Sequence, residues 1–274
     1  MFRISSDMKV QNTLLVITSI LIIFLNGCSG TRSRAQEENL IIATWNVRGY
    51  PESQQADRDW FGNQLIEMNP DIICIQEIAN QDRIKTFLAN EFRFTTVAFL
   101  DSSDGQDNAI FATEKIEMED IPDPNGFQHP AQAAYVAYKG FDAVIVTVHL
   151  SWTNISLREQ EKVILKKVIN LMLTIDPDVI IVGDFNTQEP QIQELAESLG
   201  MLVMFPSGQD GIGTTHAGNR YDHFLISPDL ANEEALSCRI QTFTGDDLVK
   251  AKRVSDHLPV IAFFKTNSQY KDRK

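Results

Sequence analysis

Short apolar runs that end in polar residues recur along the chain and predict its β-strands. Residues 179–182 form one such run, followed by Gly183, which lets the backbone turn tightly, and then by Asp184 and Asn186. Side chains two positions apart in a strand point the same way, so Asp184 and Asn186 are expected to share a face. This strand end fits either an ordinary turn held by side-chain hydrogen bonds or one edge of an active site in an open α/β sheet.

The rest of the chain alternates between helix and strand patterns. Apolar residues recur at helical spacing over residues 53–68, 81–90, 156–175 and 190–200, with Ser53 and Ser156 as expected N-caps. Strands are expected over residues 40–46, 71–75, 93–100, 108–113, 133–139, 142–150, 179–182, 221–227 and 258–264. Residues 120–130 and 208–219 are expected to be long loops. No repeat or internal linker interrupts this pattern, which predicts a single α/β domain from about residue 38 to 265.

The first 27 residues differ from this pattern and resemble a secretory signal peptide. Arg3 and Lys9 precede an uncharged apolar run at residues 14–25, which is short for a membrane span, and Cys28 stands at the expected cleavage point. The cysteine resembles the lipidated residue of bacterial lipoproteins. We therefore expect a signal peptide at residues 1–27, a lipid anchor on Cys28, a tether at residues 28–38 and the folded domain at residues 39–274. An ordinary signal peptide or an uncleaved anchor with an incidental cysteine is the alternative.

This N-terminal segment predicts a location in the bacterial cell envelope. A lipid on Cys28 would attach the protein to a membrane, either at the outer membrane or at the cell surface, and cleavage without lipid would secrete it. Ser29 after the cysteine resembles the sorting pattern for the outer membrane in Gram-negative cells.

The chain is acidic, with a formal net charge of −13. Arg3, Asp7 and Lys9 together carry +1, so a chain cleaved before Cys28 carries −14. Such a protein does not bind nucleic acid through its bulk charge, so any contact with DNA would need a local basic patch or a bound cation. The other two cysteines, Cys74 and Cys238, lie in strand candidates; they are expected either as core thiols or as a disulfide pair, and the sequence has no zinc motif.

Eight polar residues stand at or near the ends of the expected strands. They are Asn46, Glu77, His149, Asp184, Asn186, Asp222, Asp256 and His257. Each alone fits a solvated loop or a turn, but together they form a chemically complete set. Oxygen ligands suit Mg²⁺, histidines held by carboxylates suit proton transfer near neutral pH, and an amide can donate to a phosphoryl oxygen.

Six motifs containing these residues, in the same order, resemble those of the endonuclease/exonuclease/phosphatase superfamily, which includes deoxyribonuclease I. The motifs are residues 44–49, 76–77, 148–150, 183–186, 221–223 and 255–260. The resemblance implies a four-layer α/β/β/α sandwich of two mixed β-sheets. It also implies an enzyme that hydrolyses a phosphoester with a metal-activated water.

The resemblance implies a metal site as well. Glu77 matches the principal metal carboxylate, with Asn46 beside it and Asp256 as a further contributor. The expected metal is Mg²⁺, with Mn²⁺ as a substitute.

The same resemblance assigns catalytic roles. Asp222 matches the carboxylate that orients His257, and this pair or Asp184 would take the proton of the attacking water. Asp184 and Asn186 would position the water and the scissile phosphate. His149 would donate a hydrogen bond to the phosphate or protonate the leaving oxygen; its own carboxylate partner is open, with Asp107 a candidate by position alone.

Substrate identity follows less directly. Arg48 is typical of the deoxyribonuclease-like branch, and Arg48 and Arg220 are candidate phosphate contacts. We therefore expect a nuclease-like phosphodiesterase, a monomer, with DNA as the favoured substrate. The alternatives are a phospholipid hydrolase of sphingomyelinase type, a phosphatase for inositol or other small phosphates, and a surface lipoprotein without activity.

Overall fold

Twelve strands and six helices make up the part of the chain that the computed structural model describes, which is residues 39–49, 55–99, 106–122 and 126–266. The predicted signal peptide, tether, Cys28 and Ser53 lie outside these residues. The helices are α2 (Gln55–Met68), α3 (Gln81–Phe92), α4 (Ile155–Met172), α5 (Gln191–Leu199), α6 (Pro228–Glu233) and α7 (Gly245–Val254). The strands are β1 (Asn39–Asn46), β2 (Ile72–Ile78), β3 (Phe94–Phe99), β4 (Asp107–Thr113), β5 (Glu117–Ile121), β6 (His129–Tyr138), β7 (Phe141–His149), β8 (Val179–Asp184), β9 (Leu202–Val203), β10 (Asp222–Ile226), β11 (Ala235–Ile240) and β12 (Val260–Lys265).

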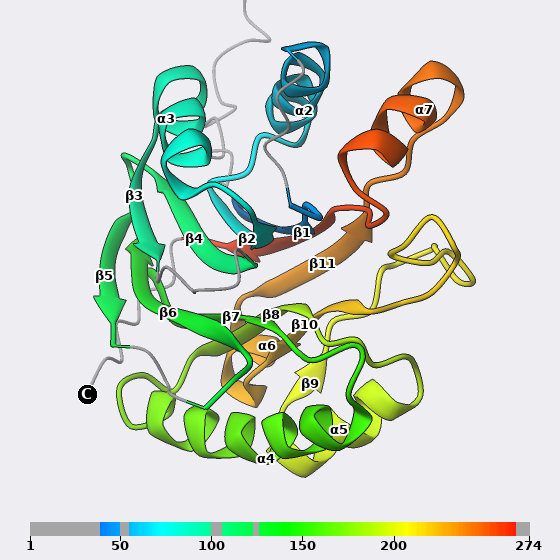
Figure 1. The fold of residues 1–274 in the computed structure, drawn as a ribbon. Helices are drawn as coiled ribbons and strands as arrows, with labels where there is room; N and C mark the ends of the chain where they lie inside the picture. The colour runs from blue at the N-terminus through cyan, green and yellow to red at the C-terminus, as the bar shows by residue number, and fades with distance from the viewer. Residues whose placement is uncertain (1–38, 50–54, 100–105, 123–125, 267–274) are drawn as a thin grey trace, which may run out of the picture. The chain divides into compact units, whose positions relative to one another are not determined.

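The strands form two mixed sheets of six (Figure 1). One has the order β11-β12-β1-β2-β4-β3, in which β1 and β2 are parallel and the other neighbours antiparallel. The second has the order β5-β6-β7-β8-β10-β9, in which β7 and β8 are the parallel pair. In Figure 1, α4 and α5 cover the second sheet, and α2 and α3 lie on the opposite side of the first.

The side chains of β7 show how the layers are built. Phe141, Ala143 and Ile145 point into the core that includes residues of both sheets, whereas Val144 and Val146 join a second core with residues of α4 and α5. A strand that is apolar on both faces is buried on both faces, as its sequence predicts. The α/β/β/α sandwich implied by the resemblance is therefore the observed fold.

Several local predictions are corrected. Asn154, not Ser156, caps α4, because its side chain accepts the backbone N–H of Leu157 at 3.0 Å. Residues 120–130 do not form one loop, since β5 extends to Ile121 and β6 begins at His129. The short helices α6 and α7 have no counterpart in the prediction, which named no helix after residue 200.

The two cysteines of the described domain are free. Cys74 and Cys238 are both buried, and burial raises the pKa of both thiols, that of Cys238 to about 12. They are thus inert core residues rather than a disulfide pair. None of the helices in the described ranges is long and apolar enough to cross a membrane.

Candidate active site

Strand register brings three of the predicted residues into one row. His149 at the end of β7 is paired with Asp184 at the end of β8, and Asp184 is paired with Asp222 at the start of β10. Each lies an even number of positions from strand residues in the core shared by the two sheets, such as Ile145, and so faces that interior. Across from this row, β1 ends at Asn46. The site therefore lies where both sheets end.

Gly183 is required for this arrangement. Its φ is +131°, a backbone conformation that L side chains rarely adopt, and a Cβ atom there would lie 2.2 Å from the carbonyl oxygen of Val148. The missing side chain lets β8 approach β7 one residue before Asp184. Gly183 is thus needed for the close pairing of β8 with β7 as well as for the turn that follows.

Asp184 makes the predicted turn with one carboxylate oxygen and faces the other predicted site residues with the second. Its Oδ1 accepts the backbone N–H of Asn186 at 2.8 Å, which is an Asx-turn. Its Oδ2 faces the site, 3.1 Å from Asn46 Nδ2, 3.6 Å from His257 Nε2 and 3.9 Å from His149 Nε2. Asn186 has φ +46° and leaves the strand, so its amide does not continue the row; it donates to the carbonyl of Leu150 at 2.9 Å.

A buried ion pair joins His257 to Asp222. Nδ1 of His257 lies 2.8 Å from Oδ2 of Asp222, and both side chains are nearly inaccessible to solvent. Burial by itself lowers the pKa of the imidazole, but the charges of Asp222 and Asp184 and the hydrogen bond that the imidazole donates to Asp222 outweigh it and raise the pKa to about 10. His257 is therefore a cation at neutral pH.

The same cluster changes the acidity of Asp184. Burial raises the pKa of its carboxyl, and the charge of Asp222 raises it further, whereas His257 and His149 lower it. A carboxyl with a raised pKa takes up a proton more readily than a surface aspartate.

Glu77 and Asn46 form the other side of the site. Asn46 Nδ2 donates to Oε1 of Glu77 at 2.9 Å as well as to Asp184, while its Oδ1 accepts the backbone N–H of Arg48 at 3.0 Å. The amide therefore presents its N–H groups, and not its oxygen, to the two carboxylates. Nε2 of His149 lies 3.5 Å from the same Glu77 oxygen.

Two residues outside the predicted set connect the elements of the site. Ser255 Oγ donates to the carbonyl of Asn46 at 2.6 Å and accepts the N–H of His257 at 2.9 Å. Thr214 Oγ1 accepts the N–H groups of Tyr221 and Asp222, at 2.9 and 3.1 Å. Short hydroxyl side chains before strands suggest turns in a sequence, but they do not reveal such long-range hydrogen bonds.

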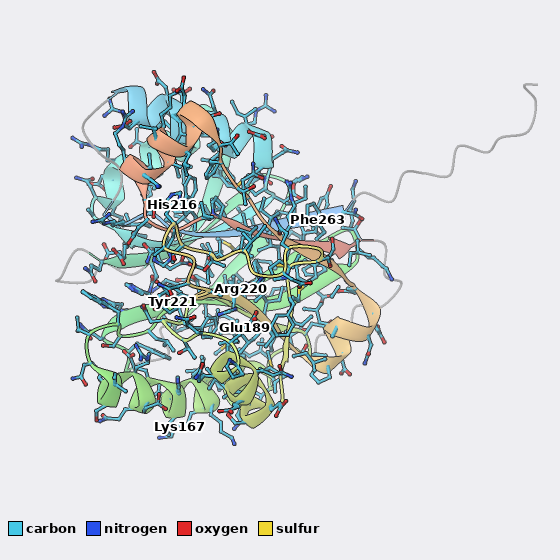
Figure 2. All side chains as sticks on the ribbon, turned by 90° about the vertical axis from the view of Figure 1, so that its right-hand side faces the viewer. Lys167, Glu189, His216, Arg220, Tyr221 and Phe263 are labelled. Carbon is cyan, nitrogen blue, oxygen red and sulfur yellow. The ribbon has the colours of Figure 1, made fainter. Side chains whose placement is uncertain are left out.

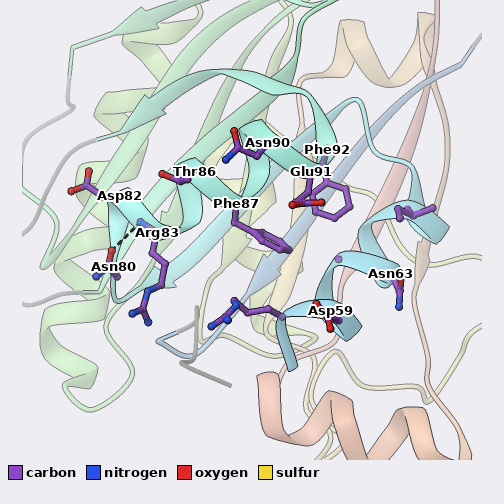
Figure 3. Close-up of a pocket in the computed structure, with 13 residues that line it drawn as sticks. Asp59, Asn63, Asn80, Asp82, Arg83, Thr86, Phe87, Asn90, Glu91 and Phe92 are labelled. Atoms are coloured by element: carbon purple, nitrogen blue, oxygen red, sulfur yellow. Dashed lines mark hydrogen bonds between the residues drawn. The ribbon is translucent and has the colours of Figure 1, made fainter. Parts of the chain in front are cut away.

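Six of the eight polar residues predicted at strand ends line a cleft of about 360 Å³, referred to below as the sheet-end cleft; Asn46 and Asp222 are not among its lining residues. Its lining residues are Arg48, Glu77, Gln106, His149, Trp152, Asp184, Asn186, Thr215, Ala217, Asn219, Tyr221, Asp256 and His257. A larger hollow of about 780 Å³ lies between α2 and α3 (Figure 3), lined by residues such as Arg58, Phe87 and Phe92. None of the predicted site residues lines that hollow, so the smaller cleft is the candidate active site.

The two predicted arginines and Asp256 differ in their surroundings. Arg48 and Asp256 lie 3.8 Å apart at the rim of the cleft, both more than half exposed. Arg220 is not among the lining residues. Its guanidinium donates to Glu189 at 2.9 Å (both are labelled in Figure 2) and to the carbonyls of Ile212 and Gln209. Arg220 therefore stabilises the loop that precedes β10, around residues 209–212.

The donor atoms fit a hard divalent cation. Glu77 supplies a partly exposed carboxylate to the cleft, and Asp184 directs a second carboxylate oxygen towards it. Ligand atoms of Asp184, Asp222 and His257 also lie within 4.8 Å of one another, but His257 and Asp222 are already hydrogen-bonded to each other. Glu77 is therefore the more available ligand, and Asn46 would offer an oxygen only if its amide turned.

The sequence profile of the Endonuclease/Exonuclease/phosphatase family matches residues 43–257, which include Asn46, Glu77 and His257. The chain belongs to this family. No curated protein matches the chain.

Solved structures agree with the family assignment. D. rerio TDP2, in complex with a single-stranded DNA product, is 20% identical with a TM-score of 0.65, covering 84% of this chain and 100% of that chain. The catalytic domain of human nocturnin, with bound sulfate, is 18% identical with a TM-score of 0.64, covering 83% and 94%. A family member from Bacteroides vulgatus is 17% identical with a TM-score of 0.64, covering 84% and 99%. At these identities the likeness shows the family fold and not a shared substrate.

Proposed function

We propose that the protein is a metal-dependent phosphodiesterase of the endonuclease type. The observation that carries the proposal is the convergence of Glu77, His149, Asp184 and His257 on one cleft, with Asn46 hydrogen-bonded to Glu77 and Asp184. Hydrolysis of a phosphodiester needs groups for the metal, the water and the anionic phosphate, and this set supplies all three.

Glu77, with Asp184 beside it, would hold Mg²⁺ or Mn²⁺, and Asn46 would add an oxygen only if its amide turned. When bound, the metal would polarise a phosphoryl oxygen and lower the pKa of water. Asp256, at the rim, would contribute to the metal's outer environment, since its carboxylate is more than half exposed and faces Arg48.

The charges in the cleft suggest which side chain would accept a proton and which would bind the phosphate. Asp184, whose pKa is raised by burial, is suited to accept the proton of the attacking water. His257, a cation held by Asp222, is suited to bind the phosphoryl oxygens electrostatically. His149 lies beside both carboxylates and would hydrogen-bond the phosphate or protonate the leaving oxygen. Asn186, at the edge of the cleft, would donate to the phosphate only if it released Leu150.

DNA is the substrate we favour. Trp152 lines the cleft with 64% of its surface exposed, and an aromatic face beside a phosphate site can stack on an unpaired base. Arg158 Nη1 donates to the carbonyl of Ser151 at 3.1 Å, which steadies the loop that carries Trp152. Arg48 would add a local positive charge in an otherwise acidic chain.

A phospholipid headgroup is the second candidate. Ile155, three positions after the cleft residue Trp152, is 66% exposed, and two exposed apolar side chains in one segment would suit a membrane surface. We further propose that the protein acts as a monomer, tethered to the cell envelope through a lipid on Cys28. Labelling of the cellular protein with radioactive palmitate, lost in Cys28→Ser, would support the anchor; equal labelling of both proteins would contradict it.

A substrate panel tests the proposal. The purified protein with Mg²⁺ is incubated with supercoiled DNA, RNA, sphingomyelin, a phosphoinositide and bis(p-nitrophenyl) phosphate. Cleavage of DNA and the aryl diester, with the lipids intact, is the expected result. Release of phosphocholine with DNA intact would replace DNA by the lipid, and no hydrolysis of any diester would overturn the proposal.

A further inference from the structure

A β-bulge in β6 brings a second histidine to the site. Along β6, Ala134 and Val136 face the other sheet, whereas Ala131 and Ala133 face α4 and α5. With unbroken alternation, His129 would face the helices, like Ala131.

The pairing of β6 with β7 changes this direction. Gln132 is paired with Thr147, but His129 is paired with His149, so three steps along β6 match two along β7. One extra residue in the bulge turns His129 to the face on which His149 lies.

The bulge is held by specific contacts. Asn108, a buried residue of β4 in the opposite sheet, donates through Nδ2 to the carbonyl of Pro130 at 2.9 Å. Pro130 has no N–H, so its place in the bulge removes no backbone donor from the ladder.

A buried glutamate connects the two chain segments just beyond the histidine pair. Glu161 of α4 is fully buried; one carboxylate oxygen accepts the N–H of Gln128 at 2.9 Å and the other accepts the N–H of Ser151 at 2.7 Å. Gln128 precedes His129, and Ser151 follows His149 by two residues. The carboxylate therefore fixes the backbones of both histidines relative to each other.

The two imidazoles are stacked. Their centroids are 4.6 Å apart, the ring planes differ by 13°, and both side chains are buried. The stack leaves Nε2 of His149 directed towards Glu77 and Asp184, at 3.5 and 3.9 Å.

We propose that His129 is a positioning residue for His149. Its ring stacks on the His149 ring and so fixes the plane in which Nε2 of His149 faces the cleft. An ordinary packed core histidine would need neither a bulge nor a parallel stack on a site residue. The catalytic consequence rests on the proposed function, whereas the orientation of the His149 ring does not.

Two substitutions that both fill the space of His129 distinguish the effect of a flat ring from the effect of side-chain volume alone. His129→Phe keeps a planar surface, and His129→Leu keeps apolar volume without one; the exposed Glu197→Gln on α5 is the control. For each, kcat and KM for bis(p-nitrophenyl) phosphate are measured with Mg²⁺, together with the thermal midpoint. The His149 ring is followed by ¹H–¹³C NMR in the metal-free protein.

We expect the leucine variant to lose on the order of tenfold to a hundredfold in kcat, because small misplacements of a reacting group have effects of this size. KM should stay within about twofold, and the phenylalanine variant should restore kcat to within about threefold of the unmodified protein. The His149 ring resonances should broaden or split in the leucine variant only. If the leucine variant does not fold, His129→Gln replaces it.

The proposal is overturned if the leucine variant keeps full kcat and a single sharp His149 signal, or if phenylalanine is as damaging as leucine. Should the unmodified protein hydrolyse no diester, the proposed function fails, and the NMR comparison alone decides whether His129 orients His149.

Discussion

The buried pair of His257 and Asp222 gives the most quantitative prediction. Asp222→Asn keeps the shape of the side chain and removes its charge. The pKa of His257 is about 10 in the folded protein, against about 6.5 for an unperturbed histidine. At about 1.4 kcal/mol per pKa unit, the surroundings favour the imidazolium by about 5 kcal/mol.

The sign of the pH dependence follows from this raised pKa. The stabilisation is fully present below about pH 6.5 and is lost as pH rises from 6.5 to 10, because the unfolded chain releases the proton first. Without the Asp222 charge, burial continues to oppose the imidazolium, so the pKa of His257 should fall. We expect Asp222→Asn to lower the free energy of unfolding by about 3 kcal/mol at pH 6 and by much less at pH 10.

Urea unfolding in EDTA from pH 6 to 10, with NMR titration of the His257 ring, measures both quantities. Glu197→Gln provides the matched control for loss of one exposed carboxylate. The reasoning is refuted if His257 of the unmodified protein titrates near 6.5, or if the stability difference between the two proteins does not change with pH.

Three further predictions concern other parts of the fold. Gly183→Ala should lower the free energy of unfolding by more than about 2 kcal/mol, seen by urea unfolding, because its Cβ would meet Val148; a change within about 0.5 kcal/mol would contradict this. Burial lowers the pKa of His223 to about 4, so the free energy of unfolding should fall by up to about 3 kcal/mol as pH drops from 6.5 to 4. In urea unfolding, the free energy of His223→Gln should depend less on pH over this range, and an equally steep dependence would refute the assignment. Trp152→Ala should raise KM for single-stranded DNA about tenfold and leave KM for bis(p-nitrophenyl) phosphate unchanged; parallel changes for both substrates would argue against base stacking.

The positions of most strands and of most candidate site residues could be predicted from the sequence, whereas β5, β9 and β11 had no predicted range. A buried strand has an apolar run that is visible locally, and polar residues directly after such runs gather at one edge of a sheet because the strand register aligns them. Asp184 and His149 are examples, since the sequence places both at strand ends and the pairing of β7 with β8 makes them neighbours.

The remaining features depend on contacts between distant segments. His129 looked like part of a loop, because a bulge shifts the alternation by one residue and leaves no local mark in the sequence. Arg220 looked like a phosphate contact, but Glu189 and two loop carbonyls occupy its guanidinium. Ser255 had no visible role, because its partner Asn46 lies 209 positions away.

The central claim is that the sheet-end cleft is a metal-dependent phosphodiesterase centre, and metal-dependent cleavage of supercoiled plasmid DNA tests it most directly. The unmodified protein and Glu197→Gln should nick the plasmid in Mg²⁺ and stop in EDTA, and Glu77→Gln should be inactive in both. Equal cleavage with and without EDTA, or full activity of Glu77→Gln, would contradict the account.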